Sequence, residues 1–344
     1  MPRMNGASLF LLGIGGVGNS FLKQLSGLGS DIKFRLAGIA DSKNYILDEQ
    51  TSLQDYQKIV LKRSLSSHPQ SLPNKDLGEL AKSVLSLNQN NLLIVDATAG
   101  ETGLFWNKII DGGAAVVTAN KKPLAGPYEE CKKFYLTRNF RYEATVGGGL
   151  PIISTIKRLR ASGDEIIDIR GLLSGTLSYI MNEVSSGKLF SEAVSEAHKL
   201  GYTEPDPRDD LSGADVKRKA LILARALGAE LPSELVQSES LVPDGLKEAP
   251  IKEFLENLRE EDYKYKRNEK LGYAVTATPF GARVAIEPLA SGDPLATLSG
   301  PENMAVIRTK RYFRHPLIIR GPGAGAEVTA QGMMGDILRL LGAL

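Results

Sequence analysis

The sequence predicts an α/β protein in which helices cover a parallel sheet in the first half and an α+β arrangement follows. Three largely apolar runs, 34–40, 92–97 and 114–119, alternate with helical patterns in the first half. Runs of this length are typical of strands buried on both faces of a parallel sheet. From Pro151 the predicted strands and helices no longer alternate strictly, which indicates a second domain of another class.

Length and composition predict a globular protein of two domains. Of 344 residues, 24% are charged, and the net charge of +2 predicts neither a nucleic-acid nor a membrane surface. The single cysteine, Cys131, excludes an internal disulfide and suits a reducing compartment. No apolar run reaches the roughly 20 residues of a membrane span, and the first strand begins too early for a signal peptide. We therefore expect a cytoplasmic protein.

The motif GlyIleGlyGlyValGly, residues 13–18, lies between the apolar run 8–14 and a helical pattern. Strand, GxGxxG and helix in this order predict a Rossmann dinucleotide-binding domain. Gly13 permits a tight turn, Gly15 lets the backbone approach a pyrophosphate, and Gly18 allows the helix to pack closely on the strand. The helix N-terminus offers amide groups to the phosphates. A glycine-rich turn without a ligand is the alternative.

The end of the second predicted strand bears on the choice of cofactor. The strand 34–40 ends at Asp41, and an acid at this place normally binds the ribose hydroxyls of NAD. Ser42 and Lys43 follow directly and could instead hold the 2′-phosphate of NADP. The sequence leaves NAD and NADP both open.

Polar residues also follow the next two strands, and ligands of such sheets bind outside the carboxyl ends of the strands. Thr98 follows the run 92–97, and Lys121 follows the run 114–119. Lys121 is placed to bind or polarise a substrate beside a nicotinamide, unless it simply faces solvent. A strand at 142–146 is expected to close this domain, which we assign to residues 1–146. Three glycines at 147–149 suggest backbone lying against a ligand or an ion.

The stretch from Glu204 to Leu227 carries the strongest chemical signal. Pro205 and Pro207 predict a rigid acidic loop, because proline fixes its own backbone and restricts the preceding residue. Ser212 is predicted to cap the helix that follows, and Gly228 is predicted to end it.

A helical projection places an acid and a base of this stretch on its apolar side. Lys217, Arg218 and Arg225 fall on the predicted solvent face, whereas Asp215 and Lys219 lie among apolar positions. One interpretation is a surface ion pair of small energetic value. Because buried charges are costly unless paired, the alternative is a polar pocket. The acids expected to share this pocket are Glu204, Asp209 and Asp210.

The rest of the second half mixes helices and strands. Ser174 is predicted to cap a helix, and a last helix is predicted at 327–341. We assign residues 147–320 to a second domain and 321–344 to a C-terminal segment. The predicted strands are 166–173, 271–277, 283–289 and 304–309.

From about residue 8 to its last residue, the chain resembles homoserine dehydrogenase. It resembles the short form, without the C-terminal ACT domain and the fused aspartate kinase of other members. The segment 201–219 is much more specific to this family than the glycine motif. The segments that carry the resemblance, in the same order as in the family, are 13–18, 118–123, 142–153, 173–180, 201–219 and 321–330.

The resemblance implies the reversible, NAD(P)H-dependent reduction of L-aspartate 4-semialdehyde to L-homoserine, a step toward threonine, isoleucine and methionine. It implies that Lys219 donates a proton to the developing alkoxide and that Lys121 and Asp215 are also catalytic. The implied substrate ligands are Glu204, Asp210, Thr176, Tyr202 and Asp215. The residues expected to bind the cofactor are Gly13, Gly15, Gly16, Val17, Gly18, Asp41, Ser42, Lys43, Thr98, Lys121 and Gly325.

The resemblance also implies a monovalent-cation site, an assembly and a domain arrangement. Sodium would be bound by Glu143 with the carbonyls of Val146, Gly148 and Leu150. The second domain would be catalytic and would form a homodimer through its sheet. The C-terminal segment would pack back on the nucleotide domain.

The implied reaction suits these residues. Hydride addition to an aldehyde carbon leaves an oxyanion that needs a positive proton donor. The carboxylates of the acidic loop can hold the α-ammonium group of the substrate by charge-assisted hydrogen bonds. Desolvation and a second lysine favour a neutral Lys219, whereas Asp215 favours its ammonium form, and the sequence leaves this balance open.

Three alternatives explain less of the sequence. A dehydrogenase that forms a thioester needs a cysteine nucleophile, and Cys131 lies in a predicted surface helix without a neighbouring histidine. A sugar dehydrogenase would account for Lys122 and Pro123 but not for the acidic loop. A nucleotide sensor without turnover would not need the lysines and carboxylates of the implied site.

Overall fold

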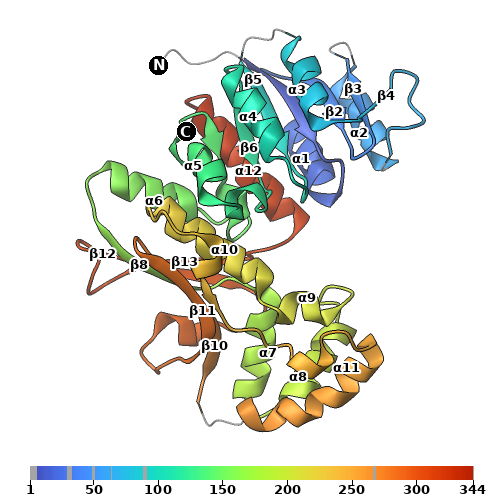
Figure 1. Cartoon of the computed structure of the whole chain (residues 1–344). Coiled ribbons are helices and arrows are strands. Elements are labelled where there is room, and N and C mark those ends of the chain that lie inside the picture. Colours follow the sequence, from blue (N-terminus) through green and yellow to red (C-terminus); the bar gives the residue numbers. More distant parts are fainter. Residues whose placement is uncertain are drawn as a thin grey trace. The chain divides into compact units, whose positions relative to one another are not determined.

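The computed structural model describes residues 6–28, 33–48, 51–62, 64–87, 91–265 and 269–343. The chain divides into two compact units (Figure 1). The first is Met1–Pro151 with Ala324–Leu344, and the second is Ile152–Gly323. The predicted boundaries after residues 146 and 320 therefore move to 151 and 323.

Close packing of glycines explains both shifts. A Cβ atom at Gly149 would lie 2.5 Å from the backbone oxygen of Val328, and one at Gly332 would lie 2.8 Å from that of Gly148. The glycine run therefore belongs with the C-terminal helix in the first unit. A Cβ atom at Gly323 would lie 1.9 Å from Nδ2 of Asn303, so Gly323 stays in the second unit.

The first unit contains a seven-stranded sheet with the order β4-β3-β2-β1-β5-β6-β7. The five adjacent strands β2, β1, β5, β6 and β7 pair in parallel, and β3 and β4 form an antiparallel edge beside β2. The three apolar runs form β2, β5 and β6, as predicted. The strands are β1 (Gly6–Leu12), β2 (Lys33–Ala40), β3 (Asn44–Leu47), β4 (Leu72–Pro73), β5 (Leu92–Asp96), β6 (Ala115–Thr118) and β7 (Phe140–Arg141).

The strand predicted at 142–146 is wrong. β7 ends at Arg141, and a 3-10 turn, η2 (Glu143–Thr145), follows it. The amide of Glu143 donates to Oδ2 of Asp336 at 2.7 Å instead of joining a strand ladder. The partner is 193 positions away in the sequence, so no local pattern could reveal it.

Helices cover both faces of this sheet (Figure 1). One face packs on α1 (Gly16–Gly27), α2 (Leu53–Leu61) and the C-terminal helix α12 (Ala326–Leu340). The other helices are α3 (Leu77–Leu85), α4 (Gly103–Asp111) and α5 (Tyr128–Leu136), with a 3-10 turn, η1 (Pro123–Ala125), before α5. Cys131 lies in α5, a surface helix as predicted because Glu129 and Glu130 are exposed, but its own side chain is buried at 1% exposure.

The second unit contains a six-stranded sheet with the order β13-β12-β8-β10-β11-β9. The four predicted strands are present as β8, β10, β11 and β12, and the neighbours among β13, β12, β8, β10 and β11 pair antiparallel. The short strands β9 and β13 were not predicted. The bounds are β8 (Ile166–Leu172), β9 (Gln237–Ser238), β10 (Leu271–Thr278), β11 (Gly281–Pro288), β12 (Asn303–Thr309) and β13 (Leu317–Gly321).

Helices of this unit pack on one face of its sheet. α6 (Ile152–Ala161), α7 (Gly175–Ser185) and α10 (Ala214–Ala226) contact its strands directly. Ser174 caps α7 as predicted, because its side chain accepts a hydrogen bond from the amide of Leu177. The remaining helical segments are α8 (Phe190–Lys199), α9 (Pro207–Leu211), η3 (Ser233–Leu235), η4 (Asp244–Leu246), α11 (Ile251–Asn257), η5 (Leu258–Tyr265) and η6 (Pro294–Thr297).

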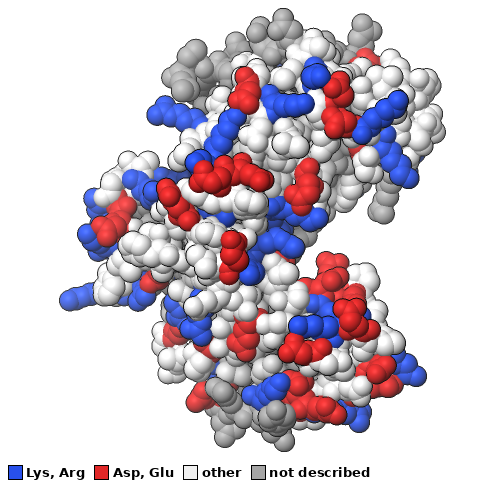
Figure 2. All heavy atoms as spheres, in the orientation of Figure 1, with Lys and Arg blue, Asp and Glu red and all other residues white. Residues whose placement is uncertain are grey.

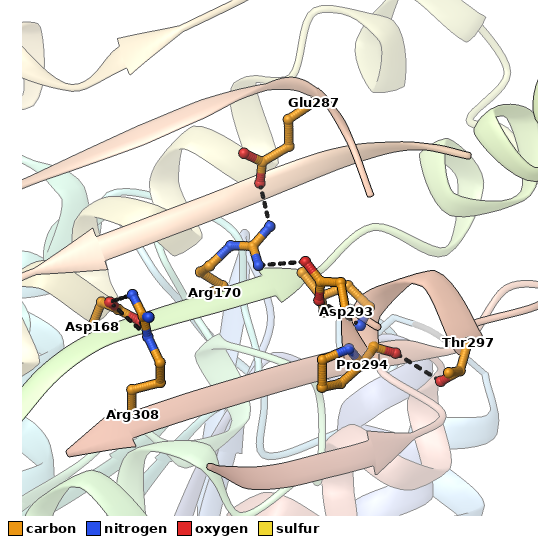
Figure 3. Close-up of polar contacts among 8 residues, drawn as sticks. Asp168, Arg170, Glu287, Asp293, Pro294, Thr297 and Arg308 are labelled. Carbon is orange, nitrogen blue, oxygen red and sulfur yellow. Dashed lines mark hydrogen bonds and ion pairs between the residues drawn. The ribbon is translucent and has the colours of Figure 1, made fainter. Parts of the chain in front are cut away.

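The other face of this sheet carries paired charges (Figure 3). Arg308 of β12 binds Asp168 of the neighbouring strand β8 through its Nε at 2.9 Å. Arg170 binds Glu287 at 3.1 Å and also Asp293, the residue that caps η6. The pairs of Arg170 hold the end of β11 and the connection between β11 and β12 on the sheet.

The face of the protein drawn in Figure 2 shows basic and acidic side chains interspersed, in keeping with the small net charge. No helix in the described part of the chain combines the length and the apolar character that a membrane crossing requires.

Candidate active site

A pocket of about 550 Å³ opens at the carboxyl ends of the parallel strands in the first unit. Five of the residues predicted to bind the cofactor line it: Gly13, Gly15, Asp41, Ser42 and Thr98. The other predicted cofactor residues, Gly16, Val17, Gly18, Lys43, Lys121 and Gly325, are not part of its lining. Sequence reasoning missed other lining residues of this pocket, among them Asn74, Lys75, Asp76, Leu77, Glu101 and Thr102.

The glycines of the motif meet different surroundings. Gly13 has a φ of 99°, and a Cβ there would lie 2.9 Å from the Thr98 methyl group. A Cβ at Gly18 would lie 2.1 Å from the carbonyl oxygen of Gly13, so helix and strand require this glycine. A Cβ at Gly15 would meet no protein atom within 4 Å. Gly15 is therefore needed not by the fold but to keep this side of the pocket open.

The carboxylate of Asp41 is engaged by its own loop. Oδ1 accepts hydrogen bonds from the amides of Lys43 and Asn44, both at 2.7 Å, and Oδ2 accepts one from Leu65 at 3.0 Å. A carboxylate has about four acceptor positions. Asp41 therefore shapes the connection between β2 and β3 and has little capacity left for two ribose hydroxyls.

A buried polar network holds the loops after β5 and β6. Asp96 is 0% exposed and accepts hydrogen bonds from the Thr98 amide and hydroxyl at 2.8 and 2.7 Å. It also accepts from the Thr102 hydroxyl at 2.7 Å and from Nε1 of Trp106 at 2.9 Å. Burial raises the pKa of Asp96, and these hydrogen bonds oppose the rise. The predicted cofactor residue Thr98 thus uses its hydroxyl within the protein.

Asn120 connects this network to the lysine loop. Its Nδ2 donates to the Gly100 carbonyl at 2.7 Å and to the Thr102 hydroxyl at 3.0 Å. Its Oδ1 accepts from the amide of Lys122 at 3.1 Å. The backbone on either side of Lys121, which is itself half-buried, is therefore fixed. The polar residues Asp96, Thr102 and Asn120 were not predicted as site residues, although Asp96 ends β5 and Asn120 lies two positions after β6.

The predicted cation ligands are part of the first unit. Glu143 is 2% exposed, and its carboxylate lies 3.3 Å from Nη1 of Arg339. Gly147 and Gly148 have φ values of 73° and 59°, a sharp backbone turn that only glycine adopts readily. Among the described residues, no group of three or more His, Cys, Asp or Glu side chains is arranged to hold a metal ion.

In the second unit, α10 brings together the predicted acid and base. Lys219 is 8% exposed, and its Nζ lies 2.8 Å from Oδ2 of Asp215 and 2.8 Å from the carbonyl oxygen of Leu173. Asp215 is more open, with 46% of its side chain exposed. An ammonium group has three N–H donors. The two contacts within the described residues leave one donor of Lys219 for an oxygen outside the chain.

The acidic loop before α10 is closed by its own hydrogen bonds. The Glu204 amide donates to Oδ2 of Asp210 at 2.8 Å, and the Thr176 hydroxyl donates to the carbonyl of Tyr202 at 2.6 Å. Burial and the nearby carboxylates of Asp209 and Asp215 raise the pKa of Asp210. The structure therefore places the predicted substrate ligands Thr176, Tyr202, Glu204 and Asp210 in one cluster.

Two details of this stretch were predicted wrongly. Gly213, with φ of 68°, is the N-cap of α10, and Ser212 is instead the C-cap of the separate short helix α9. The Ser212 hydroxyl still accepts a hydrogen bond from the amide of Ala214, the first residue of α10, at 3.3 Å. Arg225 does not face solvent: it is 3% exposed and donates to the carbonyl of Leu231 at 2.8 Å. The predicted end of the helix is confirmed, because Gly228 has φ of 101°.

These features define a two-domain protein with a Rossmann-type nucleotide-binding unit and a lysine–carboxylate cluster in its second unit. A family model described as homoserine dehydrogenase matches residues 151–338. A second model, described as homoserine dehydrogenase, NAD binding domain, matches residues 13–141. The chain belongs to the homoserine dehydrogenase family.

Curated relatives agree with this assignment. Homoserine dehydrogenase of Saccharomyces cerevisiae is 36% identical, over 96% of this chain and 96% of the relative. Bifunctional aspartokinase/homoserine dehydrogenase 1 of Zea mays is 38% identical over 96% of this chain. The chain spans only 38% of the length of that bifunctional relative.

Solved structures share the fold. A crystal structure of a Candida auris protein of unknown function has a TM-score of 0.87 at 33% identity, with 98% of both chains covered. A hyperthermophilic archaeal homoserine dehydrogenase in complex with NADPH has a TM-score of 0.76 at 24% identity, also with 98% of both chains covered. The likeness to the archaeal enzyme shows the fold alone.

Proposed function

We propose that this protein catalyses the reversible, NAD(P)H-dependent reduction of L-aspartate 4-semialdehyde to L-homoserine, a step toward threonine, isoleucine and methionine. The observation that carries the proposal is Lys219, which is buried and held by Asp215 and the Leu173 carbonyl beside an acidic loop. The similarity to the yeast enzyme over almost the full length of both chains supports the same reaction.

The lysine supplies the proton that the reaction needs. When bound, the nicotinamide cofactor donates or accepts the hydride. Lys219 directs its remaining N–H at the substrate oxygen and donates a proton as an alkoxide develops. In the reverse direction the neutral amine accepts the hydroxyl proton. The Asp215 carboxylate keeps the Nζ atom in place, and Lys121 acts as a second catalytic lysine.

The acidic loop provides the charge that the amino-acid end of the substrate requires. Glu204 and Asp210 hold the α-ammonium group, because charge-assisted hydrogen bonds to carboxylates are strong. Thr176 and Tyr202 border the same cluster. This arrangement selects a substrate that carries a positive amino group beside its aldehyde.

The first unit binds the cofactor in the pocket behind the glycine motif, and we propose that NADP is preferred over NAD. The Asp41 carboxylate already accepts hydrogen bonds from three backbone amides, which leaves it little capacity to accept from ribose hydroxyls. Ser42 and Lys75 line the same pocket and offer a hydroxyl and a positive charge to a 2′-phosphate. NADP should therefore show the lower KM in a direct comparison.

We further propose a monovalent-cation site, a homodimer and a cytoplasmic location. Glu143 and the carbonyls of Val146, Gly148 and Leu150 would bind a cation such as sodium, because Arg339 contacts Oε2 of Glu143 and a carboxylate has about four acceptor positions. These carbonyl oxygens would bind the ion and fix the turn between the strand end and α6.

The dimer would form through the sheet of the second unit, and analytical ultracentrifugation tests it.

Steady-state kinetics of the purified protein tests the proposed reaction. L-Homoserine and NADP should give nicotinamide reduction, and Lys219→Ala should abolish turnover while cofactor binding persists. Turnover that persists in Lys219→Ala would show that another group donates the proton. If the wild type binds the cofactor but does not oxidise homoserine, the protein would instead be a nucleotide sensor or a dehydrogenase for another alcohol.

A further inference from the structure

Arg208 lies in α9, between the proposed substrate ligands Glu204 and Asp210, and only 18% of its side chain is exposed. Its guanidinium group binds backbone carbonyls of the turn formed by residues 243–250. The sequence indicates only a charged, proline-bearing connection there. The contacts of Arg208 make this connection part of the support of the acidic loop.

One nitrogen of Arg208 binds three carbonyl groups of the turn. Nη1 donates to the carbonyl of Leu246 at 3.2 Å, that of Lys247 at 2.8 Å and that of Ala249 at 2.6 Å. Leu246 ends the short 3-10 turn η4, and Lys247 and Ala249 lie just beyond it. The Leu246 carbonyl also accepts from the amide of Ala249 at 3.4 Å, and the guanidinium group adds a donor for all three carbonyls.

The other nitrogens of Arg208 bind the acidic loop itself. Nε donates to Oδ1 of Asp206 at 2.9 Å, and Nη2 donates to its Oδ2 at 2.6 Å. Asp206 also caps α9, because its side chain accepts from the amide of Arg208. The ring of Phe254 in α11 lies 5.4 Å from Cζ of Arg208. A single side chain thus connects the loop, the turn and α11.

We propose that Arg208 is a positioning residue for the substrate, because it fixes the acidic loop on the turn at 243–250. α9 has five residues, too few to hold a helical conformation by itself. Its anchoring to the turn keeps Glu204 and Asp210, which flank it, in place for the α-ammonium group. This inference rests on the proposed role of those two acids.

Lysine cannot replace arginine here. The planar guanidinium group binds a carboxylate with two parallel hydrogen bonds and reaches the carbonyls with a third nitrogen. An ammonium group is a compact point charge without this fork. Arg208→Lys therefore keeps the charge and the aliphatic stem but loses the geometry.

The direction of the effect separates positioning from simple electrostatics. Removing a positive charge next to the acidic loop should by itself favour binding of the substrate's ammonium group, so Arg208→Met would lower the KM for homoserine and Arg208→Lys would leave it unchanged. Positioning predicts the opposite for both variants. A misplaced ligand raises the KM, by about 10- to 100-fold.

The experiment compares wild type, Arg208→Lys, Arg208→Met and Arg160→Met in the oxidation of L-homoserine. Arg160 is the matched control, because it also donates to a backbone carbonyl, that of Ala226 at 2.7 Å, in the second unit. We expect both Arg208 variants to raise the KM for homoserine about tenfold or more. Their KM for the cofactor and the kinetics of Arg160→Met should stay within about twofold of wild type.

Several results would overturn the proposal. An unchanged or lowered KM for homoserine in the Arg208 variants would exclude positioning. Loss of folded protein in both variants, under conditions where Arg160→Met is folded, would assign Arg208 a structural role only. A wild type that does not oxidise homoserine would instead refute the proposed function, so the two failures are distinguishable.

Discussion

Replacing Lys219 with methionine removes the ammonium group while keeping a side chain of similar length. In the wild type, Nζ lies 2.8 Å from both Asp215 and the Leu173 carbonyl, and the residue is 8% exposed. A positioned general acid contributes about 10²- to 10⁴-fold to a proton-transfer step. This range corresponds to about 3–5 kcal/mol in the activation barrier. The kcat for homoserine oxidation should fall by this factor.

Stability should change much less than activity in Lys219→Met. The lost hydrogen bond to the Leu173 carbonyl involves a charged donor and is worth about 1.5–3 kcal/mol. The ion pair with the half-exposed Asp215 adds about 0–1 kcal/mol. Methionine also removes the desolvation penalty of a buried ammonium group, so the free energy of unfolding should fall by at most about 2 kcal/mol.

The assay follows nicotinamide absorbance with saturating homoserine, and fluorescence titration measures cofactor binding. Lys217→Met is the matched control, because Lys217 is a half-buried lysine on the same helix. The control should retain wild-type kcat, and both variants should bind the cofactor with wild-type affinity. A kcat for Lys219→Met within about tenfold of wild type would refute the assignment of the proton donor.

Three further predictions concern the glycine motif, the buried network and the acidic loop. Gly15→Ala should weaken cofactor binding at least about tenfold without loss of stability. Gly18→Ala should lower the free energy of unfolding in chemical denaturation by about 1–3 kcal/mol or more. Equal stability losses in both variants would contradict the different surroundings of the two glycines. Asp96→Asn places an NH₂ group against buried donors and should cost about 1–3 kcal/mol. It should also change the fluorescence of Trp106, the only tryptophan, and an unchanged emission spectrum would count against the network. The folded-state pKa of Asp210 is raised, so ionisation of this carboxyl group destabilises the folded protein. This destabilisation is absent below the unfolded-state pKa and grows as pH rises through the folded-state pKa. Asp210→Asn should therefore raise the Tm at neutral pH and not at strongly acidic pH, and a pH-independent change in Tm would contradict this.

The sequence predicts those features whose causes are local. The glycine motif, the buried strands and the end of α10 at Gly228 depend on backbone conformation and on neighbours a few residues away. The pairing of Asp215 with Lys219 is local too, because residues four apart share one side of a helix. These parts of the fold and site agree with the structure.

The features that the sequence does not predict depend on distant partners. Arg225 is buried because the chain after α10 folds back and brings the Leu231 carbonyl to its guanidinium group. The expected strand at 142–146 is lost because Glu143 contacts Asp336 of α12. Part of the lining of the nucleotide pocket, with Asn74 and Lys75, comes from a loop without any motif. A helical projection or a motif contains no information about such partners.

The most direct test of the account is to mix the purified protein with L-homoserine and either NAD or NADP at alkaline pH and to follow nicotinamide reduction. The account predicts reduction of the nicotinamide when homoserine and cofactor are both present, and no reduction without homoserine. At low cofactor concentrations the rate should be higher with NADP than with NAD. Cofactor binding without reduction by either NAD or NADP would contradict the proposed reaction.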